Sequence, residues 1–197
     1  MSSFLVFEAP SHTPHPDLSR QLEQENSSHQ HIEKSLFLAG GISGCGNWHR
    51  DVISNLHNKC EKLFQQQTST WSSSHQQSHH DVAAITRKIK IYNPRREHFD
   101  VSDQSQSEIQ IKWEHEYLHS VQAVSFWFCS ETLCPITLYE LGKISMMPNI
   151  KLFVGVHPQY QRKLDVEIQT QLVRPEVKIV YTIEDLCDQI FDLYLSQ

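Results

Sequence analysis

The chain has 197 residues, of which 39% are hydrophobic, and a formal net charge of -6 at pH 7. This length suits one domain with a real core, and the acidic balance excludes a general nucleic-acid binder, which would carry a basic face. No apolar run approaches the roughly 20 residues of a membrane helix, and the N-terminus lacks the pattern of a secretory signal. We therefore expect a cytoplasmic protein that binds neither a membrane nor a nucleic-acid polymer.

The first 34 residues predict an N-terminal arm or linker. Ser3–Glu8 has the composition of a short strand, but three prolines follow it within eight residues and end it quickly. The main domain is expected over residues 35–197.

Five short apolar runs in this domain predict five buried strands. Uninterrupted apolar runs of this length are typical of parallel strands that are covered on both faces. One run, Ala123–Phe128, is almost wholly apolar and therefore predicts a central strand. The others are Leu36–Ala39, Ile89–Tyr92, Lys151–Gly155 and Val177–Tyr181.

Helical patterns alternate with these runs. The first helix is expected from Trp48 to Gln66 with Asn47 as its N-cap, and the Ser/Gln/His-rich residues 67–81 predict a flexible polar loop. The last helix begins at Thr182, in a sequence that resembles a capping box. The remaining helices are expected over Ser107–His119, Ile136–Met146 and Asp165–Leu172.

This alternation predicts an α/β fold, namely a doubly wound, flavodoxin- or Rossmann-like sheet of five parallel strands with helices on both faces. Ligands of such sheets bind beyond the carboxyl ends of the strands, at the topological switch point. The rule places a site among residues 40–41, 93–96, 127–134 and 155–160.

Four of the six glycines of the chain fall in residues 40–46, directly after the first apolar run. Glycines allow backbone N–H groups to face an anion or a sugar, so Gly40, Gly41, Ile42 and Ser43 are candidate substrate contacts. The run matches neither GxGxxG nor a Walker loop. A tight turn without a ligand explains it equally well.

Asn93, Arg95 and Arg96 follow the second apolar run and are also candidate substrate contacts. Arginine suits bidentate recognition of phosphate, whereas a solvated pair of surface charges is the alternative interpretation. Trp48 and Trp127 are candidates to stack on a base or to wall a pocket, although core packing is the commoner role of a buried tryptophan.

Glu140 and Glu114 are the candidate catalytic residues. Glu140 lies among apolar residues on the helix after Ala123–Phe128, and a carboxylate in such surroundings is a candidate for a tuned pKa and for covalent catalysis. An acidic residue early in a helix also serves as a partner of the helix dipole. Glu114 lies on the helix that precedes the same strand.

The five cysteines form no CxxC pair, and they and the thirteen histidines show no metal-ligand spacing. We therefore expect reduced thiols, no metal and no cofactor. Cys134 lies beside the candidate site, but no neighbouring histidine activates it, so we expect a small packing residue there.

Three segments together resemble the nucleoside 2-deoxyribosyltransferase family: Trp113–Leu118, the strand end Phe126–Phe128, and Glu131–Gly142. In that family the glutamate of an E-L-G helix start is the nucleophile, and it matches Glu140. A second carboxylate, usually an aspartate, precedes the same strand and matches Glu114. The glycine run and the Asn-Pro-Arg-Arg segment resemble further parts of the family pattern.

The sequence departs from the family pattern in two places. Several members carry an extra aspartate in the loop before the nucleophile, where this chain offers only Glu131, and the second carboxylate is a glutamate instead of an aspartate. Both departures leave the sugar and the base open.

The resemblance implies cleavage or transfer of the N-glycosidic bond of a (deoxy)nucleoside or nucleotide through a glycosyl intermediate on Glu140. It also implies a homo-oligomer, because family enzymes often complete their pockets with a neighbouring subunit. Hydrolysis of an NAD-type N-glycoside is one alternative. A nucleotide-binding or sensing module of the same fold without turnover is another, although a pure binder has no need for two converging carboxylates.

Overall fold

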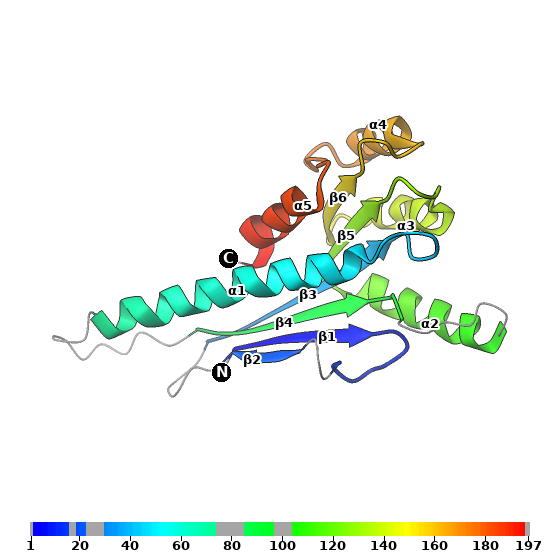
Figure 1. Ribbon diagram of the computed structural model, residues 1–197. Coiled ribbons are helices and arrows are strands. Elements are labelled where there is room, and N and C mark those ends of the chain that lie inside the picture. The colour runs from blue at the N-terminus through cyan, green and yellow to red at the C-terminus, as the bar shows by residue number, and fades with distance from the viewer. Residues whose placement is uncertain (1, 16–18, 23–29, 74–84, 97–103, 196–197) are drawn as a thin grey trace.

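Four of the five apolar runs form strands of a single sheet that is covered on both faces (Figure 1). The computed structural model describes residues 2–15, 19–22, 30–73, 85–96 and 104–195. Its six-stranded sheet has the order β2-β1-β4-β3-β5-β6. The strands are β1 (Ser2–Glu8), β2 (Arg20–Leu22), β3 (Gln30–Gly40), β4 (Ile85–Asn93), β5 (Ala123–Phe128) and β6 (Lys151–Val156).

All neighbouring strands pair in parallel except β2, which pairs antiparallel with β1 at the edge of the sheet. Every residue of β5 is buried, as expected for the strand between β3 and β6. The five parallel strands and the helices around them confirm the predicted doubly wound α/β fold.

The fifth parallel strand is not the one that the sequence predicted. Val177–Tyr181 forms only an isolated bridge between Val180 and Gly155, in which Val180 N–H donates to the carbonyl of Val154 and Val156 N–H donates to the carbonyl of Val180. Instead β1 pairs with β4 along Ser3–Glu8, and its side chains Phe4 and Val6 are fully buried. The short strand that the sequence indicated at Ser3–Glu8 is therefore present, as an internal strand of the sheet.

Two helices, α1 (Trp48–Ser73) and α5 (Ile183–Ile190), pack together on one face of the sheet, and the π-helical turn η1 (Phe191–Leu195) continues α5. The other face is covered by α2 (Gln104–Ser120), α3 (Pro135–Ser145) and α4 (Lys163–Val173) (Figure 1). This division follows from the right-handed crossovers between parallel strands. The crossover from β3 to β4 and the crossover from β4 to β5 run in opposite directions along the sheet, so their helices lie on opposite faces. None of the described helices combines the length and the hydropathy required to span a bilayer.

Both helix starts that the sequence indicated are present. Arg50 N–H donates to Asn47 Oδ1 at 3.3 Å, and Asp185 N–H donates to Thr182 Oγ1 at 3.0 Å. The first helix continues to Ser73, beyond its predicted end at Gln66, because neither glycine nor proline interrupts it. Residues 74–81 of the predicted flexible loop lie outside the described residues.

Because the chain passes from β3 to β4 on one side and then to β5 on the other, the ends of β3 and β5 flank the switch point. Gly40 of β3 stands opposite Trp127 of β5. The loops that leave these two strands run to helices on opposite faces, so they diverge and leave space between them.

Close packing between β5 and β6 requires Gly155. A Cβ added there would lie 2.6 Å from the Trp127 ring, whereas a Cβ added at Gly142 on α3 would contact nothing within 4 Å. We expect Gly155→Ala to lower the free energy of unfolding by roughly 1–3 kcal/mol through overpacking. The matched variant Gly142→Ala should raise it by about 0.5–1 kcal/mol, since alanine favours a helix interior. Urea denaturation measures both, and an equal effect at the two positions would contradict the packing argument.

Candidate active site

A pocket of about 390 Å³ lies at the carboxyl ends of β3, β4 and β5, on the side where the sheet changes direction. This volume falls in the range of roughly 300–1,000 Å³ that is usual for small-molecule sites. The lining comprises Phe37, Ala39, Gly40, Gly41, Ile42, Ser43, Pro94, Arg96, Gln110, Glu114, Thr132, Cys134, Pro135, Ile136, Thr137 and Glu140.

Glu140 reaches the pocket from the middle of α3, and Glu114 reaches it from α2. Burial raises the pKa of Glu140 to about 8, with the charge of Glu114 adding to the rise and that of Lys143 opposing it. Within the part of the chain that the structure describes, the Glu140 carboxyl forms no hydrogen bond or ion pair.

Glu114 lies in a different environment. Burial raises the pKa of its carboxyl as well, but a hydrogen bond from Gln110 and the charge of Arg96 act in the opposite direction. The two glutamates are thus close enough to interact and are stabilised differently as anions, which is the arrangement in which two carboxyl groups take separate acid and base roles.

Gln110 connects the second carboxyl group to the arginine. Its amide nitrogen donates to Glu114 Oε1 and to the carbonyl of Pro94, both at 2.6 Å, and its amide oxygen accepts from Arg96 Nε. Arg96 also donates to the side chain and the carbonyl of Gln106. These bonds fix Arg96 and Glu114 to the same face of α2.

The glycine loop, defined as residues 40–46, forms the opposite wall, where Gly40, Gly41, Ile42 and Ser43 line the pocket. Gly44 has a φ of 77°, in the left-handed region that favours glycine. The loop is held from behind, because Trp48 Nε1–H donates to the carbonyl of Gly41 at 2.9 Å.

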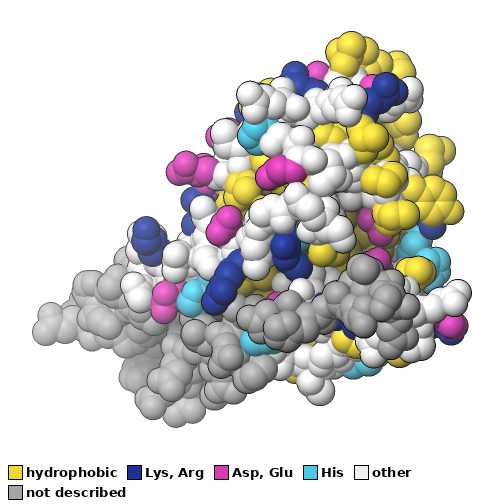
Figure 2. All heavy atoms as spheres, turned by 45° about the vertical axis from the view of Figure 1, so that its right-hand side comes forward, with side chains coloured by type: hydrophobic (Ala, Val, Ile, Leu, Met, Phe, Trp, Pro, Cys, Tyr) yellow, Lys and Arg dark blue, Asp and Glu magenta, His cyan; other side chains and the backbone are white. Residues whose placement is uncertain are grey.

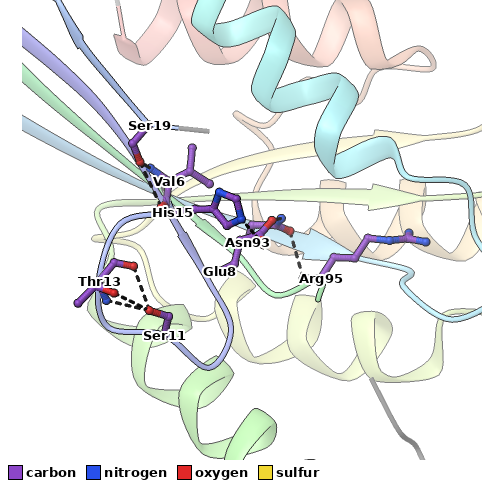
Figure 3. Close-up of polar contacts among 8 residues, drawn as sticks. All are labelled: Val6, Glu8, Ser11, Thr13, His15, Ser19, Asn93 and Arg95. Atoms are coloured by element: carbon purple, nitrogen blue, oxygen red, sulfur yellow. Dashed lines mark hydrogen bonds and ion pairs between the residues drawn. The ribbon is translucent and has the colours of Figure 1, made fainter. Parts of the chain in front are cut away.

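Four of the predicted substrate contacts do not line this pocket. Trp48 is buried behind the glycine loop, and Trp127 is buried with its ring against Gly155. The Asn93 side chain turns away toward Glu8 Oε1, 2.8 Å from its Nδ2, and Arg95 N–H donates to Asn93 Oδ1 (Figure 3). The Arg95 guanidinium donates to the carbonyls of Cys45 and Gly46, so it supports the glycine loop.

Residues 155–160, the fourth predicted segment of the site, stand one layer further out. Tyr160 is buried, and its hydroxyl donates to the carbonyl of Leu133 at 2.7 Å. This bond supports the loop that connects β5 to α3, and the segment supplies no residue of the lining.

Three cysteines far apart in the sequence meet beneath the glycine loop. Cys45 and Cys129 form a disulfide, so the prediction of reduced thiols is wrong for these two residues. The sulfur atom of Cys134 lies 3.6 Å from that of Cys129. Among the described residues, this trio is the group of ligand atoms close enough to hold a metal ion.

Several residues of the lining were not predicted from the sequence, and Gln110 is the most informative of them. Gln110 precedes Glu114 by one helical turn, so helical spacing could have identified it as a neighbour of that carboxyl group. Thr132 and Thr137 flank the start of α3 and also line the pocket. No pattern in the sequence distinguishes these threonines from others.

The fold and the pocket define a class: a doubly wound α/β protein whose switch-point crevice holds two interacting carboxyl groups and a glycine loop. The chain belongs to the nucleoside 2-deoxyribosyltransferase-like family, whose family model matches residues 33–160. The match includes the glycine loop, both glutamates and the arginine pair. No curated protein sequence matches the chain significantly.

The raised pKa of Glu140 predicts a pH-dependent loss of stability. Folding keeps this carboxyl protonated from its ordinary value of 4.5 up to about 8, so its contribution to stability is complete below pH 4.5 and is lost as the pH rises through about 8. Glu140→Gln, which is permanently neutral, should gain free energy of unfolding over the wild type progressively across that window.

Urea denaturation at a series of pH values measures the gain. Glu131→Gln, which removes a carboxyl group at an exposed position outside the pocket lining, is the matched control. A difference between Glu140→Gln and wild type that stays constant from pH 4.5 to 8 would rule out the assigned environment of Glu140.

Proposed function

We propose that the protein cleaves or transfers the N-glycosidic bond of a (deoxy)nucleoside or nucleotide, with Glu140 as the nucleophile. The observation that supports this proposal is the Glu140 carboxyl itself, which faces the pocket without a hydrogen bond to any described residue and interacts with a second carboxyl group. Membership of a nucleoside-related glycosyl transfer family agrees with it.

In the proposed reaction a carboxylate oxygen of Glu140 bonds to the anomeric carbon while the bond from that carbon to the base nitrogen breaks. The electron pair of the broken bond goes to the base, which takes a proton from Glu114. A second base or water then gives a proton to the Glu114 carboxylate as it bonds to the anomeric carbon, and the ester bond breaks and releases Glu140 as a carboxylate. The first acceptor gives a transferase, and the second gives a hydrolase.

In the free protein the proton of the pair lies on Glu140, whose pKa is raised to about 8, so the proposed reaction requires this proton to pass to Glu114. Two buried carboxyl groups that interact share their protons, so the singly protonated pair is the main species over a range of pH. That species contains one carboxylate for attack and one acid for the leaving base. Entry of a sugar that develops positive charge favours the state in which Glu140 is the anion, because opposite charges attract in a site that excludes water.

Arg96 supports a substrate that carries a phosphate. It is the cationic residue of the pocket lining and lies beside Glu114 on the rim formed by β4. A guanidinium group can bind a phosphate through two parallel hydrogen bonds. A free nucleoside has no phosphate to bind Arg96, so this part of the pocket would remain in contact with solvent.

We expect Glu140→Ala to abolish base release and to leave the melting temperature within a few degrees. The test incubates the protein with a slow 2′-fluorinated deoxynucleoside and a free second base, and mass spectrometry of the digested protein then locates any sugar adduct. The adduct should be found on the peptide that contains Glu140 and should be absent from Glu140→Ala. Glu184→Ala, a change of the same kind at an exposed position outside the pocket, is the control and should keep full activity.

Appearance of the new nucleoside identifies a transferase, and appearance of free sugar alone identifies a hydrolase. Base release that survives Glu140→Ala contradicts the assignment of the nucleophile. Nucleotide binding without base release by the wild-type protein would indicate a sensing module of the same fold.

We also propose that the protein is a homo-oligomer that associates through α3 and α4. Figure 2 shows hydrophobic side chains gathered over this part of the molecule. The surface combines exposed residues of α4 with exposed residues of α3, the helix that carries Glu140, and Ile136 belongs both to this surface and to the pocket lining. Its members are Ile136 and Tyr139 of α3, Leu133 and Met146 on either side of α3, and Leu164, Ile168, Leu172 and Val173 of α4.

A charge placed on this surface should weaken association, because a buried and unpaired carboxylate is costly. We expect Leu172→Glu to shift the chain from oligomer toward monomer in sedimentation equilibrium. Asn58→Asp adds the same charge at an exposed polar position of α1, on the other face of the sheet, and should leave association unchanged. A wild-type chain that sediments as a monomer at all concentrations would contradict the proposal.

A further inference from the structure

The disulfide between Cys45 and Cys129 joins the glycine loop to the end of β5. Cys45 belongs to the loop that forms one wall of the pocket, and Cys129 directly follows β5, from which the chain leads to α3 and the other wall. The two residues are separated by 84 positions in the sequence. The bond therefore holds the two sides of the switch point together.

Cys134 brings a third sulfur atom to this bond. It lies 3.6 Å from the sulfur of Cys129, and all three sulfur atoms lie within 4.8 Å of one another. Cys134 is the N-cap residue of α3 and lines the pocket. Its S–H donates to the carbonyl of Thr132 at 3.5 Å, which fixes the present position of the side chain.

Gly41 makes this sulfur cluster possible. A Cβ at that position would lie 2.4 Å from the sulfur of Cys45, 2.7 Å from that of Cys134 and 3.0 Å from that of Cys129. A metal ion would need a similar point, about 2.3 Å from each thiolate. On the Gly41 side of the cluster, the position nearest to all three sulfur atoms is that of the added Cβ, one carbon–carbon bond from the Gly41 backbone. A metal ion at this position would collide with the chain. The packing favours chemistry between the sulfur atoms over metal binding.

We propose that Cys45, Cys129 and Cys134 form a thiol–disulfide exchange site that controls the glycine loop. The Cys134 thiol loses its proton, and its sulfur bonds to the sulfur of Cys129. The bond between Cys129 and Cys45 breaks, its electron pair stays on the sulfur of Cys45, and that sulfur takes up the proton. No electrons are gained or lost overall, so the step needs no oxidant or reductant.

A thiolate attacks along the axis of the bond that it breaks, whereas the three sulfur atoms here form a triangle. The Cys134 side chain must therefore leave the Thr132 carbonyl and swing into line before it reacts. Exchange moves the covalent tie from the glycine loop to the short segment between Cys129 and Cys134. The loop is then held by the Arg95 and Trp48 hydrogen bonds without its covalent anchor.

Disulfide mapping of the full chain tests the exchange without reference to any activity. The protein is equilibrated in a buffer of reduced and oxidised glutathione, quenched with acid, alkylated with N-ethylmaleimide, digested and analysed by mass spectrometry. The wild type should contain both the Cys45–Cys129 and the Cys129–Cys134 linkages. Cys134→Ser should contain only the first linkage, and Cys45→Ser only the second. Cys187→Ala, which alters another buried cysteine in α5, should show the wild-type pattern.

Hydrogen exchange of the glycine loop supplies the second readout. Backbone amides of residues 40–46 should exchange faster in oxidised Cys45→Ser than in oxidised Cys134→Ser, on the order of tenfold or more, because only the second variant keeps the tie. Circular dichroism checks that both variants fold. If either variant does not fold, the disulfide map of the wild type still tests the exchange, because it requires no substitution.

Three outcomes would overturn the proposal. In the first, the wild type contains only the Cys45–Cys129 linkage, and Cys45→Ser contains Cys129 and Cys134 as two alkylated thiols. The second is equal exchange of the loop in the two variants. The third is stoichiometric zinc in the wild type that is lost in Cys134→Ser, since thiolates that hold a metal are not available for exchange.

Discussion

The parallel pairing of β3 with β5 is the constraint on which the site depends. It sets Gly40 opposite Trp127, so the loops that leave the two strands begin side by side. The crossovers then carry these loops to opposite faces of the sheet. Between them lies the pocket, with the glycine loop on one wall and α3 on the other. Gln110, Glu114 and Arg96 complete it from α2 and the end of β4.

Burial and hydrogen bonding then distinguish two chemically identical side chains. The surroundings of Glu140 offer its anion no hydrogen bond from the described residues, and Lys143 provides only partial compensation at a distance. Glu114 is equally removed from water but has the amide of Gln110 and the charge of Arg96. The difference arises from the elements that carry the residues, since α2 presents a polar row toward the pocket and α3 presents Glu140 between apolar neighbours.

The sequence predicted those parts of the molecule that depend on local patterns. Apolar runs located β3, β4, β5 and β6, and polar caps located the starts of α1 and α5. The sequence did not predict features that depend on contacts between residues far apart along the chain. The composition of Ser3–Glu8 indicated a short strand, but its position inside the sheet beside β4 could not be predicted from that composition. The disulfide joins residues 84 positions apart, and such a pairing leaves no trace in cysteine spacing. The tryptophans Trp48 and Trp127 follow the usual preference of large aromatic side chains for the core.

The hydrogen bonds of Gln110 restrict where the second proton of the pair can lie. Arg96 can only donate, so the amide oxygen must face Arg96, and the amide nitrogen must face Pro94 and Glu114. Oε1 of Glu114 is therefore an acceptor in every protonation state. When Glu114 is protonated, its hydrogen is on Oε2, the oxygen that Gln110 does not occupy. The hydrogen bonds of Gln110 thus orient the Glu114 carboxyl group as well as lowering its pKa. The oxygen that carries the proton, Oε2, is the one that can donate it to a leaving base.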